Sequence, residues 1–516
     1  MRQSPAPQRP APGATVTVSQ FNFVGNTLLS AEQLNASVQS YLHRALDFSQ
    51  LQDAAFAVAT AYRQAGWIVR TYLPAQDVQH GSVTIQVVES VFAGATVSGT
   101  AEGRVPQHRV IDILQAVLPK GAPLNAQALD RALLLMDDLP GVSVTGRLTE
   151  GQAERETGVA LTMVDEPLFT GVAGLDNQGS RSTGPARLAF SGQINSPLGL
   201  ADQLQVNAYA TEGSDYARLG YSVPAGTVGW RLGVNASQLK YRLVAPEFVT
   251  PTDLQGRGSS SATGLEATYP ILRARQKNVY LTLNYDARRF DNELNGVITT
   301  RYKSDAIMLG LSGNAFDAFG GGGVSGVSIA YTAGQLNLDG SPNQASDTAT
   351  TQAAGSFGKL RYAISRKQAM FGPLALRAAL SGQVAGKNLD SSEHFYLGGP
   401  SGVRAYPSSE GGGADGTIFN LDLLWRLGQG ITVGAFYDYG EVQVNHNNSY
   451  TGSLALNKYS LRGAGLSLAW LGPRGTAVSA TWAQRIGNNP NATAAGNDQD
   501  GSLVRDRVWL EATLTF

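Results

Sequence analysis

The side chains that most often perform catalysis or bind metals are few in this chain, and they form no recognisable constellation. The sequence contains five His and no Cys, so disulfides, thiol nucleophiles and Cys-ligated zinc or iron–sulfur clusters are excluded. The histidines are His43, His80, His108, His394 and His446. They lack the short spacing that is typical of a metal site, and we therefore expect no metal site among them.

Three further patterns lack the context that their chemistry requires. The glycine run 320–323 lies between two alternating segments, which indicates a hairpin connection rather than a phosphate-binding loop. Ser260 has no Gly-x-Ser-x-Gly sequence around it, as a hydrolase nucleophile would have. Asp137 and Asp138 stand at a helix end near Gly141 and need no catalytic role. We therefore predict a protein that is not an enzyme and that uses no cofactor.

The composition argues against an ordinary soluble protein and against a helical membrane protein. Charged residues make up 15% of the 516 residues, whereas ~25% is typical of soluble domains. The net charge of −1 gives no positive field for nucleic acid, so we expect no nucleic-acid partner. The chain lacks the run of ~18 apolar residues that a membrane-spanning helix needs. Its Pro-rich start, residues 1–14, lacks the apolar core of a signal peptide.

Residues 15–167 contain one α+β pattern twice, each time in the order strand, helix, helix, strand, strand. In the first copy the predicted segments are Val16–Val24, Ser30–Leu42, Ser49–Ala65, Trp67–Leu73 and Val83–Glu89. In the second copy they are Phe92–Ser98, His108–Val117, Asn125–Asp138, Gly141–Thr149 and Gly158–Val164. Ser30 and Gln33 form a capping-box pattern at the start of the first helix. We interpret the two copies as a duplicated domain; the alternative is two unrelated α+β domains.

From residue 168 to the C-terminus the helical period gives way to a period of two. Leu421 and Leu423 alternate with Asn420 and Asp422, for example, which predicts a strand with one apolar and one polar face. We count about 16 such segments, which suits strands of ~9–11 residues that cross a membrane. A soluble β-sandwich or propeller, the alternative, would carry more charge on its polar face. We therefore predict a transmembrane antiparallel β-barrel of about 16 strands with a polar lumen.

Four motifs give a more specific indication of the protein's class. They are Ala61-Tyr-Arg-Gln-Ala-Gly-Trp67, Tyr72-Leu-Pro-Ala-Gln-Asp-Val78, Gly174-Leu-Asp-Asn-Gln-Gly-Ser180 and Leu397-Gly-Gly-Pro-Ser-Gly-Val-Arg-Ala-Tyr-Pro407. Together they resemble motifs of the two-partner secretion outer-membrane transporters, the TpsB (ShlB/FhaC/HecB-type haemolysin secretion/activation) family. The resemblance extends from Val16 to Phe516 and implies two POTRA (polypeptide-transport-associated) domains before the barrel. The expected domains are a disordered lead-in at 1–14, POTRA 1 at 15–90, POTRA 2 at 91–167, and a barrel at 168–516 with an in-folded loop at about 386–416.

The resemblance assigns roles to six residues: Val403, Arg404, Ala405 and Tyr406 in the loop, and Phe436 and Asp438 on an adjacent barrel strand. In the family, the first motif is commonly Val-Arg-Gly-Tyr and forms the tip of a long extracellular loop that folds back into the lumen. The second motif, Phe-x-Asp, belongs to the barrel wall. Because Ala405 replaces the commoner Gly, we expect the loop to adopt no positive φ at this position.

The residues themselves support a contact between Arg404 and Asp438. In the strand around Asp438, the apolar residues alternate so that Phe436 and Asp438 face the lumen. A carboxylate there can accept two hydrogen bonds from one guanidinium, and Gly434 and Gly440 leave room for a loop. Without the resemblance, Arg404 would suit a solvated loop position and Asp438 would be one of many polar groups in the lumen. With the resemblance, we predict that the pair anchors the loop inside the pore.

The resemblance also implies a function and a location. It indicates a protein-export pore in the outer membrane of a Gram-negative bacterium, with POTRA domains in the periplasm. Its cargo would be one large TpsA-type exoprotein, such as a haemolysin or an adhesin, which the POTRA domains bind and which crosses without nucleotide. Outer-membrane lipid would surround a monomeric barrel. The alternative is a POTRA-barrel insertase that assembles other outer-membrane proteins; the presence of two POTRA-like repeats and of Tyr72-Leu-Pro-Ala-Gln favours the transporter.

Two further expectations concern cargo binding and closure of the pore. Cargo could add a strand to an exposed edge of a POTRA sheet, and Val83–Val88 and Gly158–Val164 are the candidate edges. Many family members carry an N-terminal helix that plugs the barrel. The Pro-rich residues 1–14 do not favour a helix, so we expect no plug in this segment.

Overall fold

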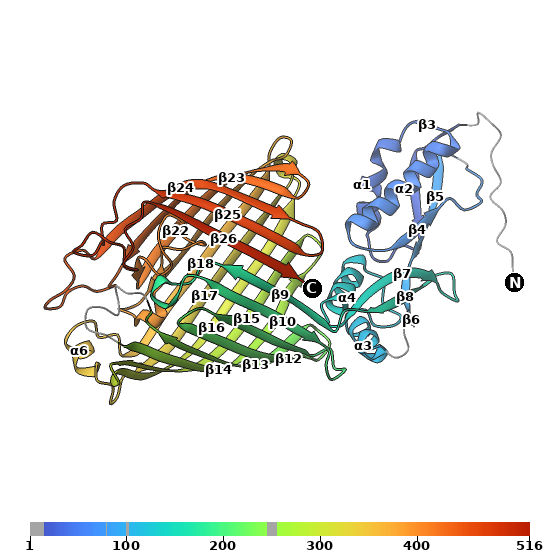
Figure 1. Cartoon of the computed structure of the whole chain (residues 1–516). Coiled ribbons are helices and arrows are strands. Elements are labelled where there is room, and N and C mark those ends of the chain that lie inside the picture. Colours follow the sequence, from blue (N-terminus) through green and yellow to red (C-terminus); the bar gives the residue numbers. More distant parts are fainter. Residues whose placement is uncertain (1–14, 79, 100–102, 245–254) are drawn as a thin grey trace. The chain divides into compact units, whose positions relative to one another are not determined.

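A computed structural model of the chain describes residues 15–78, 80–99, 103–244 and 255–516. The chain forms two compact units, residues 1–166 and residues 167–516, whose elements are labelled in Figure 1. The expectation about a plug helix falls on residues 1–14, which lie outside the described residues. In the part of the chain that is described, no helix has both the length and the apolar character to span a membrane.

The first repeat of the N-terminal unit has the predicted order of elements. It contains β1 (Val16–Thr17), β2 (Gln20–Val24), α1 (Ala31–Val38), β3 (Ala45–Leu46), α2 (Phe48–Gln64), β4 (Val69–Tyr72) and β5 (Ser82–Glu89). The predicted capping box starts α1, since Ser30 and Gln33 exchange side-chain-to-backbone hydrogen bonds. A second box, Asp47 with Gln50, starts α2. Helix α1 is shorter than predicted because its last turn tightens into a 3-10 helix, Gln39–Tyr41.

One apolar face of α2 packs on the sheet of this repeat. Leu51, Val58 and Tyr62 of α2 are buried and share one core with Val83 and Ile85 of β5. Burial of each large apolar side chain contributes about 1.5–3 kcal/mol, so this layer stabilises the domain. The apolar face that the helical period predicts is therefore confirmed, because it is the side of α2 that faces the core.

The second repeat has the same topology as the first. It contains β6 (Val91–Gly99), α3 (Gln107–Val117), α4 (Ala126–Asp137), β7 (Val142–Glu150) and β8 (Glu156–Asp165). The strand orders are β2-β5-β4 and β6-β8-β7. In both sheets the last strand runs parallel to the first and antiparallel to the penultimate one. This shared topology supports a duplicated domain over two unrelated ones.

The sheet edges expected from the sequence are wrong. Val83–Val88 lies in β5 and Gly158–Val164 lies in β8, and both are the central strands of their sheets. Alternation in a strand shows which face is buried but not which neighbours it pairs with. The edges are instead β2 and β4 in the first repeat, and β6 and β7 in the second.

A buried carboxylate, Glu89, connects the end of β5 to the loop before α1. It accepts hydrogen bonds from the backbone N–H groups of Thr27 and Leu28, at 2.6 and 2.8 Å, and from the Tyr62 hydroxyl at 2.9 Å. Arg155 of the second repeat lies 3.9 Å away. Burial raises the pKa of Glu89, but these hydrogen bonds outweigh it and hold the pKa below its ordinary value. The ionised carboxylate therefore stabilises this junction.

The second unit is a closed antiparallel barrel of sixteen strands, built from described residues. The strands are β9 (Phe169–Asp176), β10 (Arg187–Asn195), β11 (Gln203–Ala210), β12 (Ser214–Ala225), β13 (Trp230–Arg242), β14 (Gly256–Arg273), β15 (Lys277–Leu294), β16 (Val297–Asp317), β17 (Gly323–Asn337), β18 (Gly355–Ala369), β19 (Leu374–Ala385), β22 (Asp415–Gly428), β23 (Ile431–Gln443), β24 (Lys458–Leu471), β25 (Thr476–Arg485) and β26 (Asp506–Thr515). The last strand, β26, pairs with β9 and closes the barrel. The predicted fold class is thereby confirmed.

The two ends of the barrel differ in their connections. Where β9 begins and β26 ends, the strands are joined by short turns such as 429–430 and 472–475. At the opposite end the connections include three long loops, 386–414, 444–457 and 486–505. Helix α6 (Gln344–Ala349) lies in another connection at this end.

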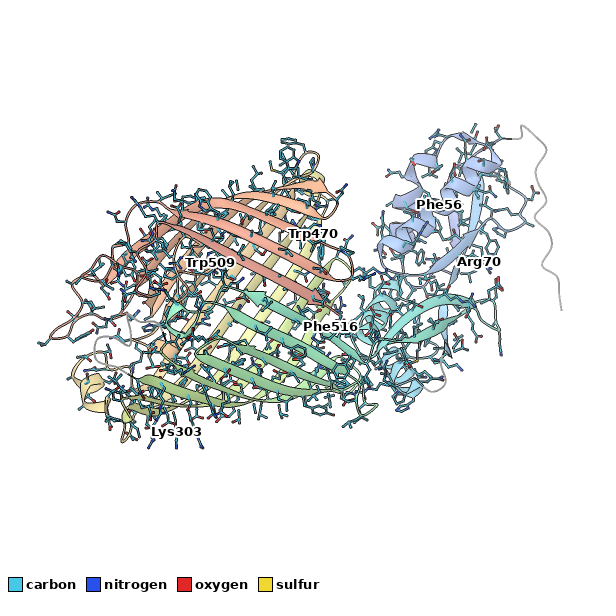
Figure 2. All side chains as sticks on the ribbon, viewed as in Figure 1. Phe56, Arg70, Lys303, Trp470, Trp509 and Phe516 are labelled. Carbon is cyan, nitrogen blue, oxygen red and sulfur yellow. The ribbon has the colours of Figure 1, made fainter. Side chains whose placement is uncertain are left out.

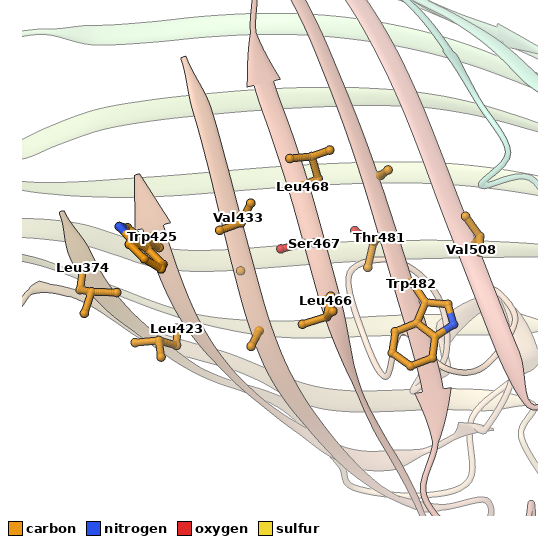
Figure 3. A pocket seen from close by; sticks show the side chains of 13 residues that line it. Leu374, Leu423, Trp425, Val433, Leu466, Ser467, Leu468, Thr481, Trp482 and Val508 are labelled. Atoms are coloured by element: carbon orange, nitrogen blue, oxygen red, sulfur yellow. The ribbon is translucent and has the colours of Figure 1, made fainter. Parts of the chain in front are cut away.

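The outer wall of the barrel is apolar across the middle of its strands. On β16, Ile307, Leu309 and Leu311 are exposed, whereas Ser304 and Ala306 on the opposite face are buried. Figure 3 shows a shallow apolar hollow of about 630 Å³ on this wall, lined mainly by aliphatic and Trp side chains such as those of Leu423, Trp425, Leu466, Leu468 and Trp482. Exposed apolar surface of this extent is the signature of a lipid-facing barrel wall.

Candidate functional site

The loop between β19 and β22, residues 386–414, folds onto the inner wall of the barrel; we call it the lumen loop. A short ladder between β20 (Phe395–Tyr396) and β21 (Gly412–Gly413) closes its base. Between these strands, Leu397, Val403, Ala405 and Tyr406 are fully buried. They pack in one cluster with inward-facing residues of the wall, namely Ile418, Phe436, Val442, Leu461 and Ala483. The loop is thus held by a small apolar core of its own.

Arg404 at the tip of the lumen loop binds two carboxylates of the wall. Its Nε donates to Asp438 Oδ2 at 2.9 Å and its Nη2 donates to Asp438 Oδ1 at 2.7 Å. Its backbone N–H also donates to Asp438 Oδ2, at 3.0 Å. The remaining nitrogen, Nη1, donates to Asp422 Oδ1 at 2.8 Å. The bidentate geometry gives the pair strength and direction.

These charges are almost completely removed from solvent. The exposed fractions are 7% for Arg404, 2% for Asp422 and 0% for Asp438. Buried charges persist only when they are paired and hydrogen-bonded. Asp422 also binds Arg377 of β19 at 3.0 Å, so two arginines balance two aspartates. The network carries no net charge and leaves no formal charge uncompensated.

Three further groups complete the surroundings of Arg404. Its guanidinium lies over the ring of Phe436, 3.5 Å from the ring centre, which is a cation–π contact. Asn420 donates from Nδ2 to Asp438 Oδ1 at 2.7 Å and to the Gly402 carbonyl at 2.9 Å. Trp509 on β26, labelled in Figure 2, donates from Nε1 to the Arg404 carbonyl at 2.8 Å. The site therefore draws on β22, β23 and β26 together.

All six residues singled out from the sequence meet at this site. Val403, Arg404, Ala405 and Tyr406 lie in the loop cluster, and Phe436 and Asp438 face them from β23. Ala405 is not among the described residues with positive φ, as we expected from the replacement of Gly. Tyr406 packs beneath the guanidinium of Arg485, which lies 4.7 Å from its ring centre.

The glycines that make room for the loop differ in part from those expected. A Cβ atom at Gly440 would lie 2.9 Å from Val403 Cγ2, so this position does accommodate the loop. The expectation for Gly434 is wrong, because a Cβ there would meet Ser467 of the neighbouring strand at 2.6 Å. The second position is Gly463 on β24, where a Cβ would lie 2.6 Å from Ala405 Cβ. Residue type alone could not show which inward glycine lies opposite the loop.

Sequence reasoning missed a second anchor, at Glu393. This side chain of the lumen loop is 4% exposed. Its Oε2 lies 2.5 Å from Lys359 Nζ on β18, and its Oε1 accepts from Arg288 Nη1 on β15 at 2.9 Å. In the barrel order β18 lies three strands and β15 six strands from β23, so the loop contacts the wall at Glu393 as well as at its tip.

A third anchor, Glu410, was missed as well. Its carboxylate is fully buried and accepts from Asn489 Nδ2 at 3.0 Å and from the Gln499 N–H at 2.8 Å. Both partners belong to the loop 486–505. Burial raises the pKa of Glu410 above its ordinary value despite these hydrogen bonds. Glu393 and Glu410 are isolated carboxylates in a Gly/Ser-rich segment, and no local pattern could have indicated their partners.

Comparison with known proteins identifies the family. A sequence profile described as haemolysin secretion/activation protein ShlB/FhaC/HecB matches residues 156–469. A profile of the ShlB-type POTRA domain matches residues 16–90. The first covers more than half of the chain.

Relatives and a solved structure agree with this result. The heme/hemopexin transporter protein HuxB of Haemophilus influenzae is 24% identical over 509 residues, which cover 95% of this chain and 85% of HuxB. The outer membrane transporter CdiB of Dickeya dadantii is 24% identical over 488 residues, covering 91% and 81%. The structure of CdiB from Escherichia coli has a TM-score of 0.73 at 21% identity and covers 99% of this chain and 93% of that one.

The relatives are transporters, so the insertase alternative receives no support. The sixteen-strand barrel and the preceding POTRA domains place the chain in the outer membrane, with the POTRA domains in the periplasm. The chain belongs to the haemolysin secretion/activation family, the outer-membrane pores that export a partner exoprotein in two-partner secretion.

Proposed function

We propose that this pore exports one large TpsA-type exoprotein of the haemolysin or adhesin class. We also propose that Arg404 anchors the lumen loop to the barrel wall during export. The observation that carries the second part is the buried network of Arg404 with Asp438 and Asp422. Relatives carry names that refer to different cargoes, such as heme/hemopexin for HuxB. The exported partner of this chain is therefore proposed by class only.

The anchor has a mechanical consequence for the pore. Arg404 fixes the loop tip to β22 and β23, while Glu393 fixes the start of the loop to β15 and β18. A chain that passes through the lumen must displace the loop from at least one section of the wall. Asp438 accepts three hydrogen bonds from Arg404, so we expect the tip to stay bound to β23 while the Glu393 contact opens.

We propose that the two repeats, residues 15–90 and 91–167, are POTRA domains that bind the cargo through their sheet edges. An extended peptide adds to an open edge through backbone hydrogen bonds. The edge strands β6 and β7 of the second repeat have nine residues each, whereas β2 and β4 of the first have five and four. A longer edge offers more backbone partners, which favours the second repeat. The barrel closes on itself, and we propose that it works as a monomer.

Secretion of the partner exoprotein tests the role of the anchor. Arg404→Ala should sharply reduce the amount of exoprotein that reaches the medium, while the barrel still assembles. Arg366→Ala is the matched control, because it removes an arginine–aspartate pair on β18 and β16 that is outside the loop. Heat-modifiable migration of the barrel on a gel checks assembly. Normal secretion by Arg404→Ala would overturn the anchoring role.

A deletion tests cargo capture. Removal of residues 15–90 should abolish secretion but leave a pore that conducts ions in a planar bilayer. If secretion continued, the first POTRA domain would not be the receptor. This experiment is independent of the loop, so the two parts of the proposal can fail separately.

A further inference from the structure

The outer wall of the barrel carries a group of basic side chains on β13–β16. We call Arg242, Arg257, Arg289 and Lys303 the basic patch; all four are exposed. In the strand register Arg242 lies directly opposite Arg257, and Arg289 lies directly opposite Lys303. Figure 2 shows Lys303 on the outside of the barrel.

The pair Arg289–Lys303 is not neutralised by the protein. The carboxylates closest in register already have partners: Asp291 binds Arg301 at 2.5 Å, and Asp305 accepts from the Tyr285 hydroxyl at 3.1 Å. Among the described residues, neither Arg289 nor Lys303 has a carboxylate at ion-pair distance. Like charges directly opposite each other destabilise a sheet, so this pair gains from an anion that comes from outside the chain.

The other pair is half neutralised. Arg257 forms an ion pair with Glu293. The guanidinium of Arg242 donates a hydrogen bond of 3.1 Å to the backbone carbonyl oxygen of Glu212. This oxygen carries no formal charge, so it does not neutralise Arg242. The basic patch as a whole therefore contains four positive charges, and only one of them is directly paired with a carboxylate.

The height of the basic patch relative to the membrane follows from the order of the strands. Strand β9 follows the periplasmic POTRA domains, and the strands alternate in direction, so β15 ends and β16 begins on the extracellular side. Arg289 comes four residues after Tyr285 on β15, and Lys303 comes four residues before Ile307 on β16. Four residues span about 13 Å along a strand, or about 10 Å along the membrane normal after the usual tilt. The Arg289–Lys303 pair thus lies just above the apolar band, at the level of the outer-leaflet headgroups, and the Arg242–Arg257 pair lies four residues farther toward the extracellular ends of the strands.

We propose that the basic patch binds the phosphates of the bis-phosphorylated glycolipid of the outer leaflet, lipid A. Cβ atoms of directly opposed residues lie about 5 Å apart, so the side chains of Arg289 and Lys303 bind the same phosphate. Arg257 stands four residues beyond Ser261, the β14 residue that lies opposite Arg289, so the two cation pairs are about 13 Å apart along the strands and about 10 Å apart across them, about 16 Å in all. A lipid with a single phosphate fills only one of them, whereas a disaccharide headgroup with a phosphate at each end fills both. This inference rests on the position of the barrel and is independent of the role proposed for the lumen loop.

Native mass spectrometry of the full chain in detergent tests the proposal. The probes are bis-phosphorylated lipid A, mono-phosphorylated lipid A and phosphatidylglycerol. The variant R289Q/K303Q removes two charges from the patch. The control K277Q/R474Q also removes two exposed charges, at the periplasmic end of β15 and in the turn 472–475. Heat-modifiable migration confirms assembly of each protein.

We expect the unsubstituted chain to bind bis-phosphorylated lipid A more tightly than either of the other lipids. R289Q/K303Q should weaken this binding about thirtyfold, because each basic residue near an anionic lipid surface contributes a factor of about five. The control should bind like the unsubstituted chain. Equal binding by R289Q/K303Q, or equal binding of phosphatidylglycerol, would overturn the proposal. If the double variant did not assemble, K303Q alone would be compared, with a several-fold loss expected and no loss refuting the inference.

Discussion

Replacing Arg404 by Ala tests whether the buried charge network holds the tip of the lumen loop. The substitution removes three side-chain hydrogen bonds, two to Asp438 and one to Asp422. Asp422 keeps Arg377, but Asp438 is left fully buried without a cation. Breaking a buried pair by removing one partner costs about 3–5 kcal/mol. Since about 1.4 kcal/mol is a factor of ten, we expect the tip to detach about 10²- to 4 × 10³-fold more often.

The absence of Cys in the sequence makes this change measurable. A single Cys in place of Ser401, an exposed residue of the loop tip, can carry a spin label without competing sites. The electron paramagnetic resonance line shape should show an immobile label in the otherwise unsubstituted chain and a mobile fraction in Arg404→Ala. Arg366→Ala is the matched control and should leave the line shape unchanged.

A second variant separates the charge effect from lost packing. Arg404→Ala/Asp438→Ala also removes the unpaired carboxylate, so part of the immobile fraction should return. If Arg404→Ala alone left the label immobile, the apolar contacts of Leu397, Val403 and Tyr406 would suffice to hold the loop, and the reasoning from the buried charges would be refuted.

Three other predictions follow from single contacts. Gly463→Val should displace the loop tip, since its Cβ would lie 2.6 Å from that of Ala405, and the spin label should become mobile. Gly220→Ala is the control and should leave the label immobile, because a Cβ there meets only ordinary contacts at 3.9 Å. Trp509→Phe leaves the carbonyl at the loop tip without its donor and should destabilise the bound loop by about 1 kcal/mol, measured as a lower denaturant midpoint for label release. The pKa of Glu89 is lowered in the folded domain, so its stabilisation is complete above the ordinary Glu pKa and is lost as the pH falls through the lower folded value. Denaturation of residues 15–166 followed by Trp67 fluorescence should show this acid sensitivity, and Glu89→Gln should reduce it; an identical pH profile for both proteins would contradict the assignment.

The features that the sequence determined by itself are those that depend on near neighbours. The capping box at Ser30 and Gln33 formed as predicted because its two hydrogen bonds join residues three positions apart. Alternation placed Phe436 and Asp438 on the inner face of β23 because successive side chains in any strand point to opposite sides. The number of strands and the lipid-facing wall follow from the same local rule applied along the barrel.

The features that only the tertiary structure decided depend on which distant segments meet. The central position of β5 and β8 reversed the expected sheet edges, since strand order is set by pairing across the sheet and leaves no mark in a single strand. Glu393 contacts Lys359, which is 34 residues away in the sequence, and Glu410 contacts Asn489, which is 79 residues away. Burial makes these contacts strong, because a carboxylate removed from water requires a partner. Burial itself is a property of the folded barrel, so no pattern of neighbouring residues could have revealed these two anchors.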